Sequence, residues 1–321
     1  MKKLKKLLYL SLMGICTLSI GGCGSAKNHK PYVAVITKST GSTFWKSVFA
    51  GAGAAATEYN LDITMEGADS EEDYEQQNEL VRQAVDNGAE VIVFSAVDFD
   101  ANAQAIDEAA QCGVKIVVID SDVNSAYVSC RIGTDNIEAG RQAAEAALFA
   151  EDEKLYVGIV NYDVHTANGQ QREQGFREVM EEDGRVEEII TINVLSTMED
   201  AREGTKKLLK ENPRINVIVT FNEWTSLGVG WAIRDMEASD DIHVVAFDSN
   251  AVTVGMLETG EVDALIVQNP YAMGYLGVET AAALANGNNV EQEKVDTATT
   301  IITRENMFEP EYQKVLFVFD E

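Results

Sequence analysis

Residues 91–122 read VIVFSAVDFDANAQAIDEAAQCGVKIVVIDSD, and this stretch decides the fold. Two apolar runs rich in β-branched residues, 91–96 and 115–120, enclose a polar turn and an amphipathic helical pattern. Runs this apolar are typical of strands covered on both faces, as in a parallel sheet, and the helix between them supplies the crossover connection. The stretch therefore predicts a βαβ unit.

The same design recurs along the chain. Further strands are predicted at 33–37, 61–65, 155–160, 188–194, 215–221, 242–248 and 262–268, with helical patterns between them. Residues 217–250, VIVTFNEWTSLGVGWAIRDMEASDDIHVVAFDSN, repeat the order strand, polar turn, helix, strand and aspartate. All βαβ units resemble one another to some degree, but Asp120 and Asp248 close the two units in the same way. We predict an α/β fold with two doubly wound parallel-sheet lobes that face each other.

Polar residues gather where the predicted strands end. In open α/β sheets, ligands lie outside the carboxyl ends of the strands, so these residues are expected to converge on one cleft. An Asp or Asn after a strand can also be a helix N-cap, which is an equally good explanation for any one of them. Six strand ends together favour a binding site. The residues are Lys38, Ser39, Ser95, Asp120, Asn222, Asp248 and Gln268.

The turn after the first predicted strand carries aromatic residues where phosphate-binding folds place glycines. Residues 42–56 read STFWKSVFAGAGAAA, and the glycines follow inside the helix, where we expect them to allow close helix–sheet packing. Phe44 and Trp45 offer flat apolar faces suited to the C–H face of a sugar ring, although we expect one of them to pack in the core. Carboxylates accept hydrogen bonds from hydroxyls, and amides both donate and accept. The cleft is therefore predicted to bind a neutral polyol.

Catalysis is the less favoured interpretation of the aspartates. Paired carboxylates also occur in glycosidases. However, the sequence contains no nucleophile elbow, zinc motif or glycine-rich phosphate loop, so we expect a binding protein without a cofactor. His29, His165 and His243 lie far apart without ligand spacing, which argues against a metal site.

The N-terminus has the pattern of an export signal. Four lysines precede an apolar run at positions 7–20. A helix needs about 20 residues to span a bilayer, and this run is shorter, as in a secretory signal. Ile20-Gly21-Gly22-Cys23 resembles a bacterial lipobox, so we expect residues 1–22 to be removed and Cys23 to be lipidated, with a plain signal peptide as the alternative. The expected location is extracytoplasmic, anchored to the cell membrane by that lipid.

The charge limits the partners. The formal net charge is −28, and it becomes −32 without residues 1–22, which hold four lysines and no acid. Such a chain repels nucleic acids, whose binding depends on Lys and Arg, and it does not favour a strongly anionic ligand. Cys112 and Cys130 are the cysteines left after Cys16 and Cys23. They are too few for a disulfide framework, and two free buried thiols are favoured over a pair.

These features resemble the sugar-binding periplasmic binding proteins of the ribose and galactose type, the solute receptors of ABC importers. The resemblance covers residues 32–303 and depends on several motifs in combination. They are STFW (42–45), IDSD (119–122), IGTDNIEAGRQ (132–142), QQREQGF (170–176), FNEWTSLG (221–228), VVAFDSN (244–250) and VQNPYAMGYLGVET (267–280).

The resemblance implies a monomer of two lobes, joined by a three-segment hinge, that close on a ligand. It implies a signal peptide at 1–22, a lipidated linker at 23–31, an N-terminal lobe of 32–132 with 269–297, and a C-terminal lobe of 133–268 with 298–321. It further implies that an ABC permease receives the ligand. The ligand-binding residues implied by the match are Ser42, Phe44, Trp45, Ser95 and Asp120 on one lobe, and Gln170, Asn222, Asp248 and Gln268 on the other.

Two departures from the ribose-type pattern bear on the ligand. Ribose-type proteins carry arginines where this chain has Ser121 and Gln170, which makes D-ribose itself doubtful. Lys38, together with SAV (95–97) and IDSD, also resembles receptors for autoinducer-2, a furanose-like signal. A receptor that presents autoinducer-2 or a sugar to a sensor kinase or chemoreceptor is therefore the alternative to import.

Overall fold

The chain forms two sheets of six strands within the residues that the structure describes. A computed structural model describes residues 30–290 and 292–317. The first sheet contains β1 (Tyr32–Thr37), β2 (Asp62–Gly67), β3 (Val91–Phe94), β4 (Lys115–Ile119), β5 (Val128–Thr134) and β11 (Lys294–Thr297). The second contains β6 (Leu155–Asn161), β7 (Val186–Asn193), β8 (Val217–Thr220), β9 (His243–Phe247), β10 (Ala264–Val267) and β12 (Thr300–Thr303).

The two sheets have the same topology. Their strand orders are β11-β5-β4-β3-β1-β2 and β12-β10-β9-β8-β6-β7. Within the described residues, each strand pairing is parallel except β10 with β12, which is antiparallel. The prediction of two doubly wound lobes of one design is therefore confirmed, and the antiparallel pair at one edge is an addition to it.

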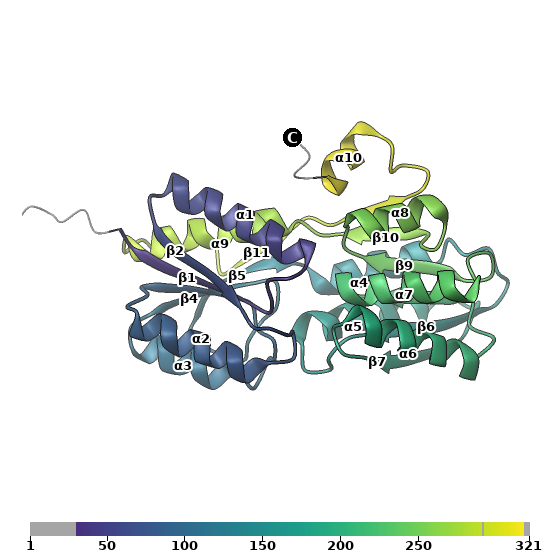
Figure 1. Ribbon diagram of the computed structural model, residues 1–321, viewed down its shortest axis with the longest axis horizontal. Coiled ribbons are helices and arrows are strands. Elements are labelled where there is room, and N and C mark those ends of the chain that lie inside the picture. Colours follow the sequence, from purple (N-terminus) through teal and green to yellow (C-terminus); the bar gives the residue numbers. More distant parts are fainter. Residues whose placement is uncertain (1–29, 291, 318–321) are drawn as a thin grey trace, which may run out of the picture. The chain divides into compact units, whose positions relative to one another are not determined.

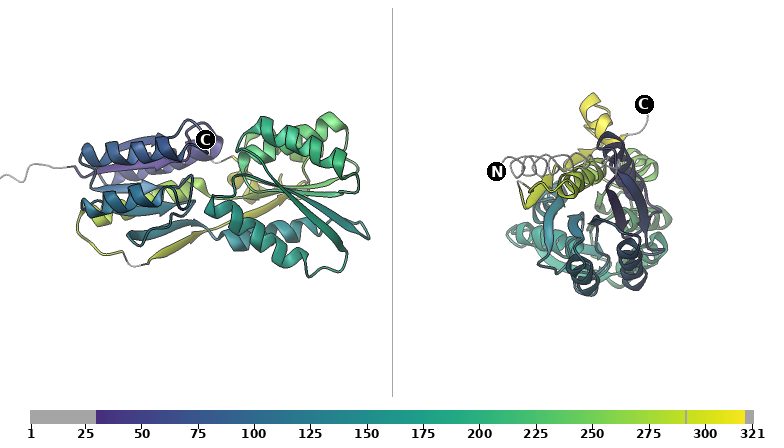
Figure 2. Two further views of the ribbon diagram at one scale, coloured as in Figure 1. Left: turned by 90° about the horizontal axis from the view of Figure 1, so that it is seen from below. Right: turned by 90° about the vertical axis from the view of Figure 1, so that its left-hand side faces the viewer.

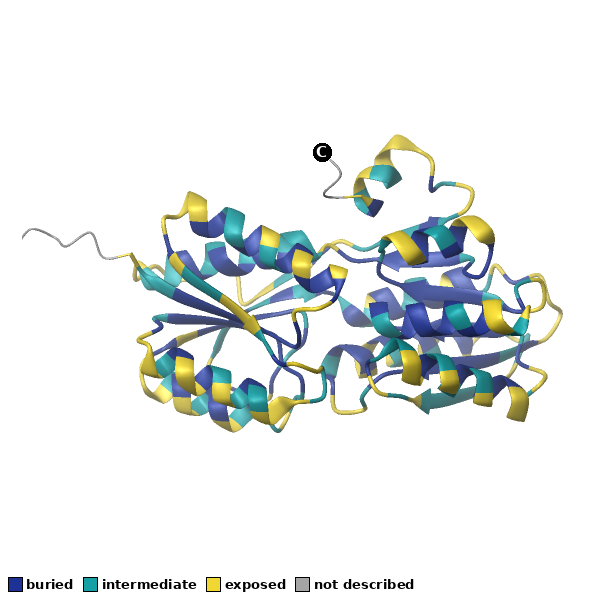
Figure 3. Cartoon of the chain, in the orientation of Figure 1, coloured by how far each residue is buried: buried dark blue, intermediate teal, exposed yellow. Residues whose placement is uncertain are grey.

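Helices cover both faces of each sheet (Figures 1 and 2). The N-terminal lobe, built on the first sheet, carries α1 (Thr43–Glu58), α2 (Tyr74–Asp86), α3 (Ala103–Gln111) and α9 (Pro270–Ala285). The C-terminal lobe carries α4 (Asn136–Ala147), α5 (Ala167–Met180), α6 (Met198–Glu211), α7 (Glu223–Met236), α8 (Ala251–Thr259) and α10 (Pro310–Leu316). Because both faces are covered, β3 and β8 are fully buried along their length, as their unbroken apolar sequences predict (Figure 3).

The chain passes between the sheets at three places in the described residues. The crossings lie between β5 and α4, between β10 and α9, and between β11 and β12. The first sheet extends to Thr134, and Asp135 then caps α4 of the other lobe by accepting a hydrogen bond from the backbone N–H of Glu138. These crossings supply the hinge that the family resemblance implies.

The described cysteines are not paired. Cys130 is buried in β5, where its thiol donates to the carbonyl of Gln292, while Cys112 is exposed after α3. The expectation that both thiols are free is confirmed, but the expected burial of Cys112 is wrong because it follows the last turn of a surface helix. No helix in residues 30–290 and 292–317 has the length and apolar character needed to cross a membrane. The predicted signal peptide and Cys23 lie outside the described residues.

Candidate functional site

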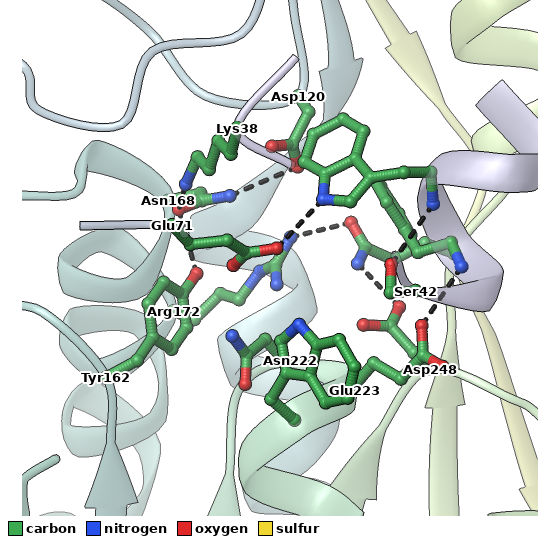
Figure 4. Close-up of a pocket in the computed structure, with 14 residues that line it drawn as sticks. Lys38, Ser42, Glu71, Asp120, Tyr162, Asn168, Arg172, Asn222, Glu223 and Asp248 are labelled. Carbon is green, nitrogen blue, oxygen red and sulfur yellow. Dashed lines mark hydrogen bonds between the residues drawn. The ribbon is translucent and has the colours of Figure 1, made fainter. Parts of the chain in front are cut away.

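A pocket lies between the lobes at the carboxyl ends of their strands. Both lobes contribute to it, and Figure 4 shows the side chains that line it pointing toward one another. From the N-terminal lobe these are Lys38, Ser42, Phe44, Trp45, Glu71 and Asp120. From the C-terminal lobe and the hinge they are Tyr162, Asn168, Arg172, Asn222, Glu223, Trp224, Asp248 and Gln268.

The strand ends deliver most of the predicted residues. Lys38 follows β1, Asp120 follows β4, Asp248 follows β9 and Gln268 follows β10, and each lines the pocket. Asn222 follows β8, and it is both a pocket residue and a helix N-cap, the two roles considered from the sequence. Its Oδ1 accepts from the backbone N–H of Thr225 as the N-cap of α7, and its Nδ2 donates to Ser196 Oγ at 2.7 Å. The predicted convergence of these side chains is present in the structure.

Asp120 and Asp248 occupy equivalent positions in the two lobes with the same unusual backbone. The φ angle is 56° at Asp120 and 66° at Asp248. Both values are positive and lie in the left-handed region that non-glycine residues seldom adopt. Each N–H donates at 3.0 Å to the neighbouring strand, Asp120 to Ile132 and Asp248 to Ile266. Because such backbone conformations concentrate at functional sites, the two matching carboxylates, one from each lobe, make this pocket the candidate site.

Asp120 is held by side chains from both lobes. Ser95 Oγ donates to Asp120 Oδ2 at 2.9 Å, and Asn168 Nδ2 of the C-terminal lobe donates to Oδ1 at 3.1 Å. Ser95, predicted as a site residue, is buried behind the aspartate and does not itself line the pocket. Its position indicates that it orients Asp120.

Asp248 is buried and accepts a side-chain hydrogen bond from Gln268 Nε2 at 2.7 Å. Burial raises the pKa of Asp248 to about 7, against the opposing effects of the Arg172 charge and the Gln268 amide. Gln268 Oε1 accepts from Arg172 Nη2 at 2.6 Å and from Thr134 Oγ1 at 2.8 Å, which fixes the orientation of the amide. Thr134 and Arg172 thus hold the Gln268 amide, and this amide in turn holds Asp248 in its orientation toward the pocket.

Lys38 is a buried amine among acceptors. Its Nζ donates to Asn168 Oδ1 at 3.2 Å and lies 5.6 Å from the centre of the Tyr162 ring. Burial lowers the pKa of Lys38, while the charges of Asp120 and Glu71 oppose that shift. Lys38 thus places a buried amine in the pocket lining, where it is held by Asn168.

Gln170 is not at the pocket, contrary to the sequence-based prediction. It is exposed on α5, and Arg172 is the α5 residue that lines the pocket. Two residues along a helix correspond to a rotation of about 200°, so these two side chains leave opposite faces. Arg172 is buried, and it donates to the carbonyl of Phe221 at 2.6 Å as well as to Gln268.

Arg172 also bears on whether the ligand is D-ribose. The sequence made D-ribose doubtful because Ser121 and Gln170 stand where ribose-type proteins carry arginines. The structure places one guanidinium, that of Arg172, at the pocket. Ser121 is then the remaining departure, and it is buried with no hydrogen-bond partner for its hydroxyl. D-ribose therefore belongs among the sugars to be tested.

Phe44 and Trp45 both line the pocket and both belong to the core of the N-terminal lobe. Their rings meet edge to face, with centroids 4.9 Å apart and an interplanar angle of 88°. Trp45 Nε1 donates to Glu71 Oε1 at 2.8 Å, so the indole is held by this hydrogen bond as well as by its contact with the Phe44 ring. The expectation that only one of them packs in the core is wrong, since each residue contributes both to the core and to the pocket lining.

Loops and helix starts supply the residues that sequence reasoning missed. Glu71 comes from the loop after β2 and accepts from Ser39 Oγ and Ser196 Oγ as well as from Trp45, and burial raises its pKa. Nothing in the acidic run around it distinguished Glu71 from its neighbours. Tyr162 had a usable signal, because it follows the predicted strand at 155–160 just as the other polar residues follow theirs.

The pocket is nearly filled by its own side chains. The remaining space is about 30 Å³. That is room for about two water molecules. Side chains of the two lobes fill the rest of the pocket and hydrogen-bond directly to each other, as Lys38 does to Asn168. A ring-sized molecule would fit here only by displacing some of these contacts.

The family profile described as "Periplasmic binding protein domain" matches residues 33–289. This chain belongs to the periplasmic binding protein domain family. The family consists of solute-binding proteins rather than enzymes, so the predictions of the family, of its fold and of a non-enzymatic protein are confirmed.

Known members of the family cover nearly the whole chain. The D-ribose/D-allose-binding protein of Pseudomonas aeruginosa is 25% identical over 93% of this chain and 98% of its own length. A carbohydrate transporter solute-binding protein from Agrobacterium radiobacter, solved with D-arabinose, is 29% identical with a TM-score of 0.86, covering 90% of this chain and 99% of that one. A solute-binding protein from Agrobacterium vitis, solved with D-fucose, is 28% identical with a TM-score of 0.85, covering 89% and 99%.

Proposed function

We propose that this protein is an extracytoplasmic receptor that captures a neutral monosaccharide or similar polyol between its lobes and delivers it to an ABC importer. The observation that carries the proposal is the pair Asp120 and Asp248, presented at one pocket by equivalent strand ends of the two lobes. Each accepts hydrogen bonds from sugar hydroxyls, and hydrogen bonds to charged groups contribute about 1.5–3 kcal/mol. The sugars named for the relatives, D-ribose, D-allose, D-arabinose and D-fucose, are all of this class.

The balance of charges supports a neutral ligand. Two cationic side chains, Lys38 and Arg172, stand beside four carboxyl groups in the pocket lining. The cationic groups do not outnumber the carboxyl groups, so no excess of positive groups is present to attract an anion. Hydroxyl groups find acceptors in the carboxyl groups and donors in the ammonium, guanidinium and amide groups. Phe44, Trp45 and Trp224 add apolar surface for the C–H face of the ring.

Capture follows from the direct contacts between lobes. With the lobes apart at the hinge, the ligand reaches one half-site. Closure then brings the second aspartate to it, and sugar hydroxyls replace bonds such as Lys38 to Asn168. Micromolar affinity, about −8 kcal/mol, requires only a few such bonds and ring contacts after the costs of ordering. The lipid on Cys23 would keep the receptor beside its permease.

A second candidate ligand is the furanose-like signal autoinducer-2. The observation that favours it is Lys38 beside Asp120 in the pocket, the pair that carries that resemblance. In this case a sensor kinase or chemoreceptor, rather than a permease, would read the closed form.

A fluorescence titration tests both candidates. The chain from Ser25 onward contains the compact unit Pro31–Glu321, and two of its tryptophans, Trp45 and Trp224, line the pocket. We expect a saturable change with one or a few members of a panel of pentoses, hexoses, inositols and autoinducer-2, and no change in Asp248→Ala, whose melting should show an intact fold. An unchanged signal and melting temperature across the panel would refute the sugar, and binding retained in Asp248→Ala would refute the site.

A further inference from the structure

Glu223 reaches from the C-terminal lobe to the first turn of α1 in the N-terminal lobe. The backbone N–H of Thr43 donates to its Oε1 at 3.2 Å, and the backbone N–H of Phe44 donates to Oε2 at 3.0 Å. Figure 4 shows Glu223 in the pocket. Both contacts join residues of different lobes, and Glu223 is buried. The side chain therefore connects the two lobes directly.

The contact completes an unfinished helix end. The first N–H groups of a helix have no partner within it. In α1 the Ser42 hydroxyl accepts from Trp45, which leaves the N–H groups of Thr43 and Phe44 for Glu223. A carboxylate at this position also complements the positive end of the helix dipole. When the lobes are apart, water has to replace this partner.

Glu223 has little acceptor capacity left for a ligand. A carboxylate has about four acceptor sites. Besides the two N–H groups of α1, Glu223 Oε1 accepts from Asn250 Nδ2 at 3.1 Å within its own lobe. Its position in the pocket lining thus reflects contacts with the protein itself.

We propose that Glu223 sets ligand affinity by stabilising the closed arrangement of the lobes, and that it does so without recognising the ligand. The link to affinity rests on the proposed function, but the effect on closure does not. The contact from Ser196 to Glu71 also joins the lobes, so loss of Glu223 weakens closure without abolishing it. We expect the closed-to-open ratio to fall roughly two- to thirty-fold, the range for a charge at a helix end.

Two substitutions remove the contact from opposite sides. Glu223→Gln keeps the shape but loses the charge and turns an NH₂ group toward an N–H donor. Thr43→Pro removes one donor N–H at the first helical position, where proline fits well. Ser42 already has φ -79 and ψ 163, in degrees. This is the extended conformation that the residue before a proline adopts.

Glu58→Gln, at the other end of α1, is the matched control for the lost charge. Glu58 accepts from the Tyr275 hydroxyl within the N-terminal lobe, so its substitution alters no contact between the lobes. An effect shared by Glu58→Gln and Glu223→Gln would therefore come from net charge rather than from closure.

The first readout needs no ligand. Labels on cysteines introduced at the exposed residues Asp69 and Glu199, one in each lobe, would report the distance distribution between the lobes in a Cys112→Ser background. We expect a larger open fraction in Glu223→Gln and in Thr43→Pro, an effect in the double variant smaller than the sum, and no change in Glu58→Gln. An unchanged distribution in both single variants would overturn the proposal, whatever the sugar titration gives.

The second readout uses the sugars that bind. In both variants the dissociation constants of all binding sugars should rise by one common factor, with faster dissociation and an unchanged rank order. A changed rank order in Glu223→Gln would show that Glu223 contacts the ligand and would overturn the proposal. If no sugar binds the wild type, the proposed function fails, and the distance measurement still decides the role of Glu223.

Discussion

Asp248 lines the pocket, and burying its carboxylate costs free energy. Burial raises its pKa from 3.8 to about 7, so between these pH values the folded protein holds a proton that the unfolded chain has released. Stability increases with pH only where the unfolded state binds more protons, and here the folded state binds more. The contribution of Asp248 to stability is therefore full below about pH 4 and is lost as pH rises through about 7.

Asp248→Asn should remove this dependence. Relative to the wild type, we expect the variant to become more stable as pH rises from 5 to 8, by at most on the order of 3 kcal/mol, because about two pH units of this interval lie below the raised pKa. Thermal unfolding of both proteins at several pH values would measure the difference. A difference that stays constant over this range would show that Asp248 titrates near its ordinary pKa.

At the residue scale, sequence reasoning succeeded where position along a strand decides the outcome. Lys38, Asp120 and Asp248 follow apolar strands of the two sheets, and the carboxyl ends of these strands meet at the pocket. Glu71 and Glu223 were not predicted as pocket residues, because their contacts depend on how one lobe packs against the other. No local sequence pattern indicates that packing. The prediction of Gln170 was wrong for a related reason. Arg172 is two residues further along the same helix, so it points from the opposite face.

At the element scale, glycines set how closely two pairs of helices pack. A Cβ on Gly140 of α4 would lie 2.1 Å from the carbonyl oxygen of Arg172, and one on Gly51 of α1 would lie 2.1 Å from that of Tyr271 in α9. Backbone atoms cannot move aside as a flexible side chain can. Of the glycines in α1 predicted to allow helix–sheet packing, Gly51 thus allows helix–helix packing, and Gly140 of α4 sets how closely α5, the helix that carries Arg172, can approach.

Gly140→Ala should force α5 outward. We expect a loss of stability of about 1–3 kcal/mol or more from overpacking, and weaker sugar binding because Arg172 shifts away from Gln268. Gly53→Ala in α1 is the matched control. Nothing lies within 4 Å of the added Cβ, so it should stabilise the helix by up to about 1 kcal/mol. Thermal unfolding and the sugar titration would test both, and equal effects of the two substitutions would contradict the packing argument.

The strands that the sequence missed share a physical character. All nine predicted strands are present, and seven of them are apolar and almost wholly buried, whereas β2 and β7 at the sheet edges consist of exposed and half-buried residues. β5 alternates buried and half-buried residues and contains Ser129 and Arg131, so it lacks the unbroken apolar run. β11 and β12 have four residues each and lie at a hinge crossing, where the chain leaves one sheet and enters the other. Their pairing depends on strands far away in the sequence.

At the scale of the whole molecule, the internal repeat was sufficient to predict two matching lobes. Units 91–122 and 217–250 correspond to β3-α3-β4 and β8-α7-β9, which occupy the same places in the two sheets. The closeness of the lobes could not be predicted, because direct contacts such as Asn168 to Asp120 join residues far apart in the sequence.

A ligand held by both lobes should stabilise them together. At a concentration one hundred times the dissociation constant, we expect a gain of about 2.7 kcal/mol in unfolding free energy. Calorimetry with and without a binding sugar would measure it, and both lobes should unfold at higher temperature. A shift confined to one lobe, seen as two separated transitions, would contradict a site shared between Asp120 and Asp248.

Because of the three crossings, each lobe needs a segment from near the end of the chain before it is complete, first β11 for the N-terminal lobe and then β12 for the C-terminal lobe. The C-terminal lobe takes five of its six strands from one continuous segment, β6 to β10, whereas the N-terminal lobe needs α9 and β11 from near the end of the chain. Gly274 of α9 packs directly on the backbone of Val48 in α1. The packing of α1, the first helix of this lobe, is therefore complete only after α9 has been synthesised. The N-terminal lobe is thus unfinished until Thr297 has been added, and until then the apolar surface that α9 and β11 cover remains exposed.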